Sequence, residues 1–146
     1  MRGARRRVTA ATVSLWGATV GAVAWDEQKG LGTFEYERKF CQSGLQIAPL
    51  TMPLEAERIY SFPGLNTKTF HGLAGLLADC LPDHYGNKLI EVWLERQGRS
   101  IADFNPVERL CYMGARGTGA LEFKPSIGPR NRTSVPLEVS ELSRFA

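Results

Sequence analysis

The longest apolar pattern with a helical period lies in the middle of the chain, over Thr69–Gly98. Its first half places apolar residues at steps of three and four, which brings them onto one face of a helix: Phe70, Leu73, Leu76, Leu77, Cys80 and Leu81. Pro82 cannot continue a helix, whereas Asp83 can cap a second one with its carboxylate. That second helix carries Tyr85, Leu89, Ile90, Trp93 and Leu94. The pattern therefore predicts a core of two helices that meet at Leu81-Pro82-Asp83.

A strand pattern precedes this helix pair. Val8–Trp16 and Thr19–Trp25 are rich in β-branched and small residues, and they predict a β-hairpin that turns at Gly17-Ala18. Leu31–Glu37 alternates and predicts a third antiparallel strand, with Gly32, Phe34 and Tyr36 on one side.

The same N-terminal stretch has the layout of a secretory signal peptide. An arginine-rich head is followed by a moderately apolar run and by small residues at Ala22-Val23-Ala24. The run contains one Leu, no Ile and no Phe, but four hydroxyl residues, which is typical of strands. The hairpin is favoured, and an exported protein that loses residues 1–24 is the alternative.

The segments between the third strand and the helix pair give weaker patterns. Phe40–Gly44 is interpreted as a connection, and Leu45–Ile47 and Glu57–Phe62 each predict a further short strand. Pro49–Leu54 contains two prolines, so it is expected at a sheet edge or in an extended loop.

Downstream of the helix pair, the residues that mark the N-terminus of a helix form clearer patterns. Ser100–Asp103 has the pattern of a capping box on a single turn. Asn105, Pro106 and Glu108 predict a capped helix over Pro106–Met113 that ends at Gly114. Ala120–Lys124 predicts a strand. The expected fold is thus α+β, a small antiparallel meander packed with a helical pair.

The C-terminal part predicts the domain organisation. Residues 8–125 are expected to form one domain and 126–135, rich in Gly, Pro, Arg and Asn, a linker. Residues 136–146 have the pattern of an amphipathic helix without a C-cap, and they are interpreted as the start of a helix that belongs to a further, missing domain.

Charge and cysteine content narrow the classes of function. The net charge is +3, but four of the positive charges lie within residues 1–7, and the rest of the chain has 14 basic and 15 acidic side chains. This distribution argues against direct nucleic-acid binding, and no apolar run is long enough for a membrane span. The three cysteines, Cys41, Cys80 and Cys111, are dispersed, which argues against a zinc site and suits a reducing cytoplasm.

Candidate catalytic groups are few. His71 and His84 flank the predicted helix break, with Asp79 and Asp83 nearby, but sequence neighbours on a helix do not face each other. The glycine-rich stretch Gly114–Gly119 follows a helix and precedes a strand, the wrong order for a phosphate-binding loop, and is interpreted as a turn with glycine at positive φ. No catalytic motif is found, so catalysis by this chain alone is not expected.

Several residue groups, in order and spacing, resemble the N-terminal subdomain of HipA-type serine/threonine kinases, the toxins of HipBA-type type II toxin–antitoxin systems. The resemblance runs from about Val13 to Lys124 and rests on these groups: Trp16-Gly17, Val20-Gly21, Trp25-Asp26, Phe34-Glu35-Tyr36, Pro49–Leu54, Gly75-Leu76-Leu77, Leu81-Pro82-Asp83 and Gly119–Phe123.

The resemblance implies a cytoplasmic, non-catalytic domain that precedes a kinase core. The ATP-gripping loop and the catalytic and metal-binding Asp residues of the family lie beyond this chain, so ATP and Mg²⁺ would belong to the missing kinase domain. It implies structural or interface roles for the landmark positions Leu81, Pro82, Asp83, Gly119, Ala120 and Leu121.

The implied partners are a HipA-like kinase core, in cis or in trans, and a HipB-like DNA-binding antitoxin. A truncated or split toxin is the first hypothesis. The alternative is a stand-alone antitoxin-like protein that binds and inhibits a separate kinase.

Overall fold

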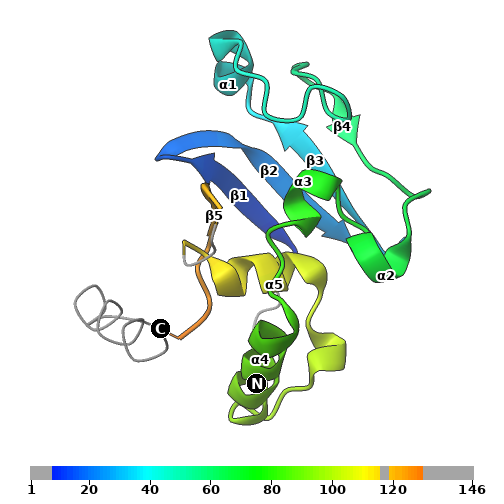
Figure 1. Cartoon of the computed structure of the whole chain (residues 1–146), viewed down its shortest axis with the longest axis vertical. Helices are drawn as coiled ribbons and strands as arrows, with labels where there is room; N and C mark the ends of the chain where they lie inside the picture. The colour runs from blue at the N-terminus through cyan, green and yellow to red at the C-terminus, as the bar shows by residue number, and fades with distance from the viewer. Residues whose placement is uncertain (1–7, 116–118, 130–146) are drawn as a thin grey trace.

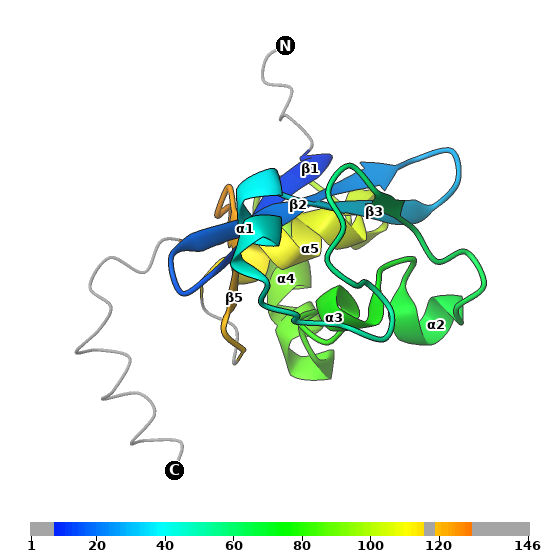
Figure 2. The same ribbon diagram turned by 90° about the horizontal axis from the view of Figure 1, so that it is seen from above.

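The computed structural model describes residues 8–115 and 119–129. The arginine-rich start, the helix expected over 136–146 and most of the expected linker lie outside these ranges. Within them, one antiparallel sheet carries helices on one of its faces (Figures 1 and 2). The α+β fold class is confirmed.

The sheet has five strands in the order β4-β3-β2-β1-β5. The first four form a meander, and the last returns across the molecule to pair with β1, Leu15 opposite Leu121. The strands are β1 (Ala10–Leu15), β2 (Ala18–Asp26), β3 (Leu31–Tyr36), β4 (Ile59–Tyr60) and β5 (Leu121–Lys124). The N-terminal hairpin is confirmed and supplies two inner strands of the sheet.

The hairpin turn differs by one residue from the prediction. It lies at Trp16-Gly17 rather than Gly17-Ala18, because Leu15 pairs with Ala18 and leaves a two-residue loop. Both loop residues have positive φ, 49° and 85°, as in the turns that match the twist of paired strands.

The helices among the described residues are short, and α4 is the longest of them. They are α1 (Arg38–Ser43), α2 (Thr67–Phe70), α3 (Gly75–Ala78), α4 (His84–Glu95), the 3₁₀ turn η1 (Ile101–Asp103) and α5 (Pro106–Met113). The Asn105–Glu108 capping box and the Pro106 start of α5 are confirmed. At η1, the Ser100 side chain accepts a hydrogen bond from the Ala102 amide, which confirms Ser100 as its cap.

The continuous helix predicted for the first half of Thr69–Gly98 is wrong. The segment forms α2 and α3, separated at His71-Gly72, where both residues have positive φ (53° and 81°). A β-carbon on Gly72 would come within 2.5 Å of the Gly30 carbonyl oxygen, so the backbone here packs closely against the turn between β2 and β3. A distant contact therefore overrides the local helical pattern.

Two other local predictions are wrong between β3 and β4. Arg38–Ser43 is a helix rather than a connection, because Phe40 is buried and stacks on Tyr36, and Gly44 ends the helix with a φ of 74°. Leu45–Ile47 forms no strand, and only Ile59–Tyr60 of the predicted 57–62 segment pairs in the sheet. The loop predicted at Pro49–Leu54 is confirmed.

The core is divided between two clusters with α5 between them. Val107, Leu110 and Cys111 of α5 are fully buried in the larger cluster, against the inner face of the sheet and α3. Tyr112 of α5 lies in the smaller one, with Ile90 and Leu94 of α4. The predicted helix pair is thus not a single core.

The predicted apolar set of α4 is only partly buried. Ile90 and Leu94 are fully buried, but Tyr85 and Leu89 are 68% and 45% exposed. These apolar positions are spread too widely around α4 for one neighbouring element to cover all of them. Tyr85 and Leu89 therefore lie on the solvent side.

The Pro49–Leu54 loop is fixed by two tyrosine hydroxyls. Tyr36 donates to the Met52 carbonyl oxygen at 2.6 Å, and Tyr60 donates to the Pro53 carbonyl oxygen at 2.6 Å. Burial, with smaller contributions from Tyr60 and Cys41, raises the pKa of Tyr36 to about 12. Tyr36 therefore stays protonated in the fold at pH values where an unfolded tyrosine ionises.

This shift predicts a loss of stability at alkaline pH. Because the folded pKa lies above the unfolded value near 10, the stabilisation is fully present below pH 10 and is lost as pH rises toward 12, with a slope of at most about 1.4 kcal/mol per pH unit from this group. We expect Tyr36→Phe to be less stable at pH 7 by about 1 kcal/mol, for the lost hydrogen bond, yet to show a shallower decline above pH 10. Urea denaturation from pH 7 to 11 measures both effects.

A second group with a raised pKa does not disturb the comparison between the unchanged chain and Tyr36→Phe. Burial, and then Glu108, also raises the pKa of Cys111 to about 12, but Cys111 is present in both proteins and contributes equally to both curves. Parallel pH profiles of the two proteins would contradict the assignment to Tyr36.

Candidate functional site

A groove of about 620 Å³ opens where α3, α4, the C-terminal end of α5 and β5 meet. Its lining includes all six landmark positions, Leu81, Pro82, Asp83, Gly119, Ala120 and Leu121. Residues that are far apart in the sequence are therefore brought to one surface. The other lining residues are Leu15, Ile47, Leu76, Asp79, Cys80, Gly86, Met113, Gly114 and Phe123.

One wall is the bend between α3 and α4. The Asp83 carboxylate accepts a hydrogen bond of 2.8 Å from the Gly86 amide, which confirms it as the N-cap of α4. A β-carbon on Gly86 would lie 2.8 Å from the Pro82 β-carbon, so only glycine permits this close packing. The predicted break at Leu81-Pro82-Asp83 is thus real, and it shapes a surface.

The opposite wall is the return of the chain from α5 to β5. Gly114 ends α5 with a φ of 51°, which confirms positive φ at the start of the glycine-rich stretch, and its carbonyl oxygen accepts from the Phe123 amide at 3.1 Å. Residues 116–118 of that stretch lie outside the described ranges. Pairing of β5 with β1 then places Leu121 beside Leu15 in the groove.

The described lining of the groove consists mainly of apolar residues and includes two acidic ones. Apart from Asp79, Asp83 and the Cys80 thiol, the described lining residues have no ionisable side chain. Burial, and then the charge of Asp79, raises the pKa of Cys80, which makes its thiol a weak nucleophile near neutral pH. The described lining thus offers contact surface rather than a reactive group.

The histidines do not assemble a catalytic site in the described part of the chain. His71 follows α2 and His84 begins α4, and no hydrogen bond or ion pair joins either one to Asp79 or Asp83 among residues 8–115 and 119–129. The same ranges contain no group of three or more His, Cys, Asp or Glu placed to hold a metal ion. Cys41, Cys80 and Cys111 are free thiols.

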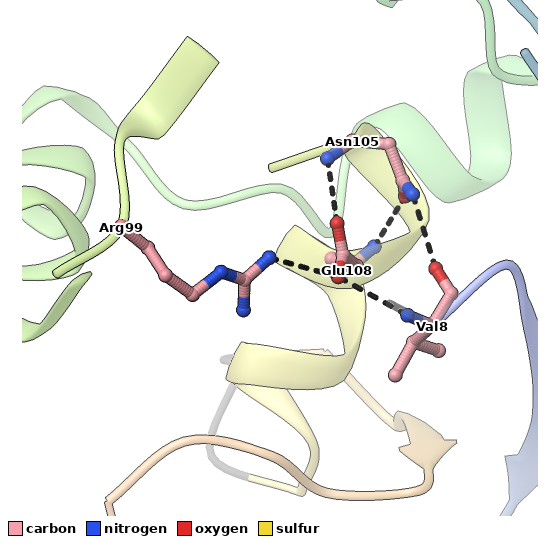
Figure 3. A network of polar contacts seen from close by, with 4 residues as sticks. All are labelled: Val8, Arg99, Asn105 and Glu108. Atoms are coloured by element: carbon pink, nitrogen blue, oxygen red, sulfur yellow. Dashed lines mark hydrogen bonds and ion pairs between the residues drawn. The ribbon is translucent and has the colours of Figure 1, made fainter. Parts of the chain in front are cut away.

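A buried polar network, shown in Figure 3, lies outside the groove. Glu108, fully buried, accepts hydrogen bonds from the Asn105 and Val8 amides at 2.9 and 3.1 Å, and it pairs with Arg99 at 3.4 Å. Asn105 in turn donates to the Val8 carbonyl oxygen at 3.0 Å. The capping box was predictable, but its contacts with Val8 and Arg99 were not, because no local pattern signals them.

Sequence reasoning also missed part of the groove. Leu15 of β1, Met113 of α5 and Ile47 of the loop between α1 and β4 also line the groove, and each was expected only as an ordinary apolar position. Their shared surface depends on the β1–β5 pairing, for which the sequence carries no local signal.

The fold and the groove define a small α+β domain with an apolar contact surface and no assembled catalytic or metal-binding group in its described residues. The chain belongs to the HipA N-terminal domain family, whose model matches residues 11–124. The resemblance inferred from the sequence is confirmed. No protein of curated function matches the chain. None of the described helices has both the length and the apolar character that a membrane crossing requires.

Proposed function

We propose that this domain is the non-catalytic N-terminal domain of a HipA-like kinase system and that it acts by binding a kinase core through the groove. The observation that carries the proposal is the convergence of the six landmark positions, Leu81–Asp83 and Gly119–Leu121, on one apolar surface. Protein interfaces have such a composition at their centres, where charged residues are depleted.

The described chemistry of the groove supports a protein ligand over a nucleotide. Phosphate groups are bound by basic side chains or by convergent backbone amides at glycine-rich turns. The charged side chains of the described lining are Asp79 and Asp83, which would repel a triphosphate. In this proposal ATP and Mg²⁺ bind to the kinase core, which performs phosphotransfer, and the complex acts in the cytoplasm.

The kinase core can belong to the same polypeptide or to a second one. In the first case the domain contributes to the folding of a toxin, whole or split. In the second case the protein acts as an antitoxin-like inhibitor of a separate kinase. A HipB-like DNA-binding antitoxin is the further partner that the family membership suggests.

Co-purification with a HipA-like kinase core tests the proposal. Ala120 is exposed in the groove, so Ala120→Arg adds bulk and charge there without removing a buried contact. We expect this variant to reduce the captured kinase about tenfold or more, because a charged side chain is poorly tolerated at the centre of an apolar interface. Pull-down from a co-expression strain, quantified against the unchanged chain, measures the loss.

A matched control is available on the same sheet. Ala24 is exposed on the opposite, open face, so Ala24→Arg makes the same substitution away from the groove. It should leave capture unchanged. Equal capture by the two variants, or no capture by the unchanged chain, would contradict the proposed function.

A further inference from the structure

An exposed tryptophan lies next to the groove. Trp16 is 80% exposed and is the first residue of the two-residue turn between β1 and β2. The residue before it, Leu15, lines the groove and pairs with Leu121 of β5. Because β1 and β5 are antiparallel, extending this register by one residue places Trp16 opposite Ala120, which is an exposed lining residue. Trp16 therefore adds an aromatic side chain to the rim of the groove.

The backbone at Trp16 has a conformation that a bulky side chain disfavours. Its φ is 49°, in the left-handed region where Gly, Asn and Asp are the usual residues of a two-residue hairpin turn. Holding another residue there costs stability. Trp16 belongs to neither of the core clusters that the described residues form, so packing does little to offset that cost. Within the described fold, Trp16 thus costs stability without contributing to the core.

The groove carries negative charge that its described lining does not neutralise. Asp79 and Asp83 are both exposed, and neither forms an ion pair with another described side chain. Glu122 and Lys124 alternate with the buried residues of β5, so they belong to its other face, and their charges cancel. Arg116 lies outside the described ranges, and even if its charge is counted, one negative charge remains. A partner with basic side chains would therefore complement this surface.

We propose that Trp16 is an anchor residue of the partner-binding surface, and that the partner presents an apolar centre with lysine or arginine beside it. The inference rests on the proposed function, because it takes the partner to be a HipA-like kinase core. Tryptophan is enriched among the residues that dominate binding energy in protein interfaces. Its ring also binds the cationic side chains that the two carboxylates attract. An Asn-Gly turn would favour the fold, whereas Trp16-Gly17 favours binding.

Trp16→Asn tests the anchor, because asparagine tolerates a positive φ. We expect the variant to capture about tenfold less of the HipA-like kinase core in the co-expression pull-down. Its melting temperature should stay the same or rise by about 2–4 °C, because the strain at residue 16 is smaller. A loss of binding without a loss of stability separates an interface role from a role in folding.

Two further variants serve as controls. Trp16→Phe keeps an aromatic ring and should retain at least about a third of the capture. Ile59→Thr is the matched control, because Ile59 is 65% exposed and lies on β4, at the opposite edge of the sheet from β5. It removes apolar surface of similar exposure away from the groove and should leave capture unchanged.

The salt dependence of capture tests the charge of the partner. Capture by the unchanged chain should fall as salt is raised from about 0.05 to about 0.5 M, because salt screens charges across an interface. The double variant Asp79→Asn Asp83→Asn should show at most about half of that fall. Asparagine at position 83 can still cap α4. Equal salt dependence of the two proteins would exclude a basic partner surface at the groove.

The outcomes separate this inference from the proposed function. Full capture by Trp16→Asn, when Ala120→Arg prevents capture, would overturn the inference and leave the proposed function intact. Loss of capture together with a lower melting temperature in Trp16→Asn would also overturn it, since the turn would then act through the fold. No capture by the unchanged chain would instead contradict the proposed function.

Discussion

Replacing Glu108 with alanine is expected to destabilise the fold by about 3–5 kcal/mol, the cost of removing one partner from a buried ion pair. The substitution leaves the Val8 and Asn105 amides without their acceptor and the Arg99 guanidinium without its counter-charge. Because a domain of this size has about 5–15 kcal/mol of total stability, the loss is a large share of it. Urea denaturation followed by circular dichroism measures the change.

Two other substitutions test whether the loss of stability in Glu108→Ala comes from the charge and the buried contacts of Glu108. Glu108→Gln keeps the size of the side chain and one acceptor oxygen but removes the charge, so it should cost less than alanine does, about 1–3 kcal/mol. Glu95→Ala removes an exposed glutamate from α4 and should change stability by no more than about 0.5 kcal/mol. A loss below about 1 kcal/mol in Glu108→Ala would show that the network of Figure 3 contributes little.

Gly72→Ala is expected to cost about 3 kcal/mol. Gly72 has a φ of 81°, where an alanine costs about 1 kcal/mol, and its β-carbon would lie 2.5 Å from the Gly30 carbonyl oxygen and 3.1 Å from the Trp25 ring. Relief of this contact requires a shift of backbone, which would also disturb the 2.8 Å hydrogen bond from the Gly32 amide to the Gly72 carbonyl oxygen. The free energy of unfolding in urea is again the measured quantity.

Gly30→Ala separates the two costs. Gly30 also has positive φ, 65°, but a β-carbon there meets nothing within 4 Å. It should therefore lose only the conformational part, about 1 kcal/mol. Equal losses at the two positions would mean that the close approach of Gly72 to the sheet does not constrain the fold.

The elements that were predictable from the sequence are those with a complete local signal. The caps Asp83 and Asn105 each precede a helix by one residue, and the alternation of Leu31–Tyr36 matches its burial. The failures have distant causes. The segment over 69–81 is helical by pattern, but the contact of Gly72 with Gly30 divides it, and no window of local sequence contains both residues.

In the groove, too, local sequence patterns and distant contacts make separate contributions. Its six landmark positions were known as members of two separate motifs, and nothing local indicated that these motifs share a surface. The link is made by β5, which pairs with β1 at the opposite end of the chain and so brings Gly119–Leu121 toward Leu81–Asp83. Six residues of the lining had been singled out from the sequence, whereas their shared surface depends on the sheet topology.

The pairing of the first strand with the last one has a consequence for synthesis. On the ribosome, β1 and β2 emerge early and can form their hairpin, but the free edge of β1 stays unpaired until β5 has been made. An exposed inner edge of this kind can recruit strands from neighbouring nascent chains. A chain interrupted before Leu121 would retain that edge permanently, so premature termination within this gene should give aggregates rather than a shortened, soluble domain.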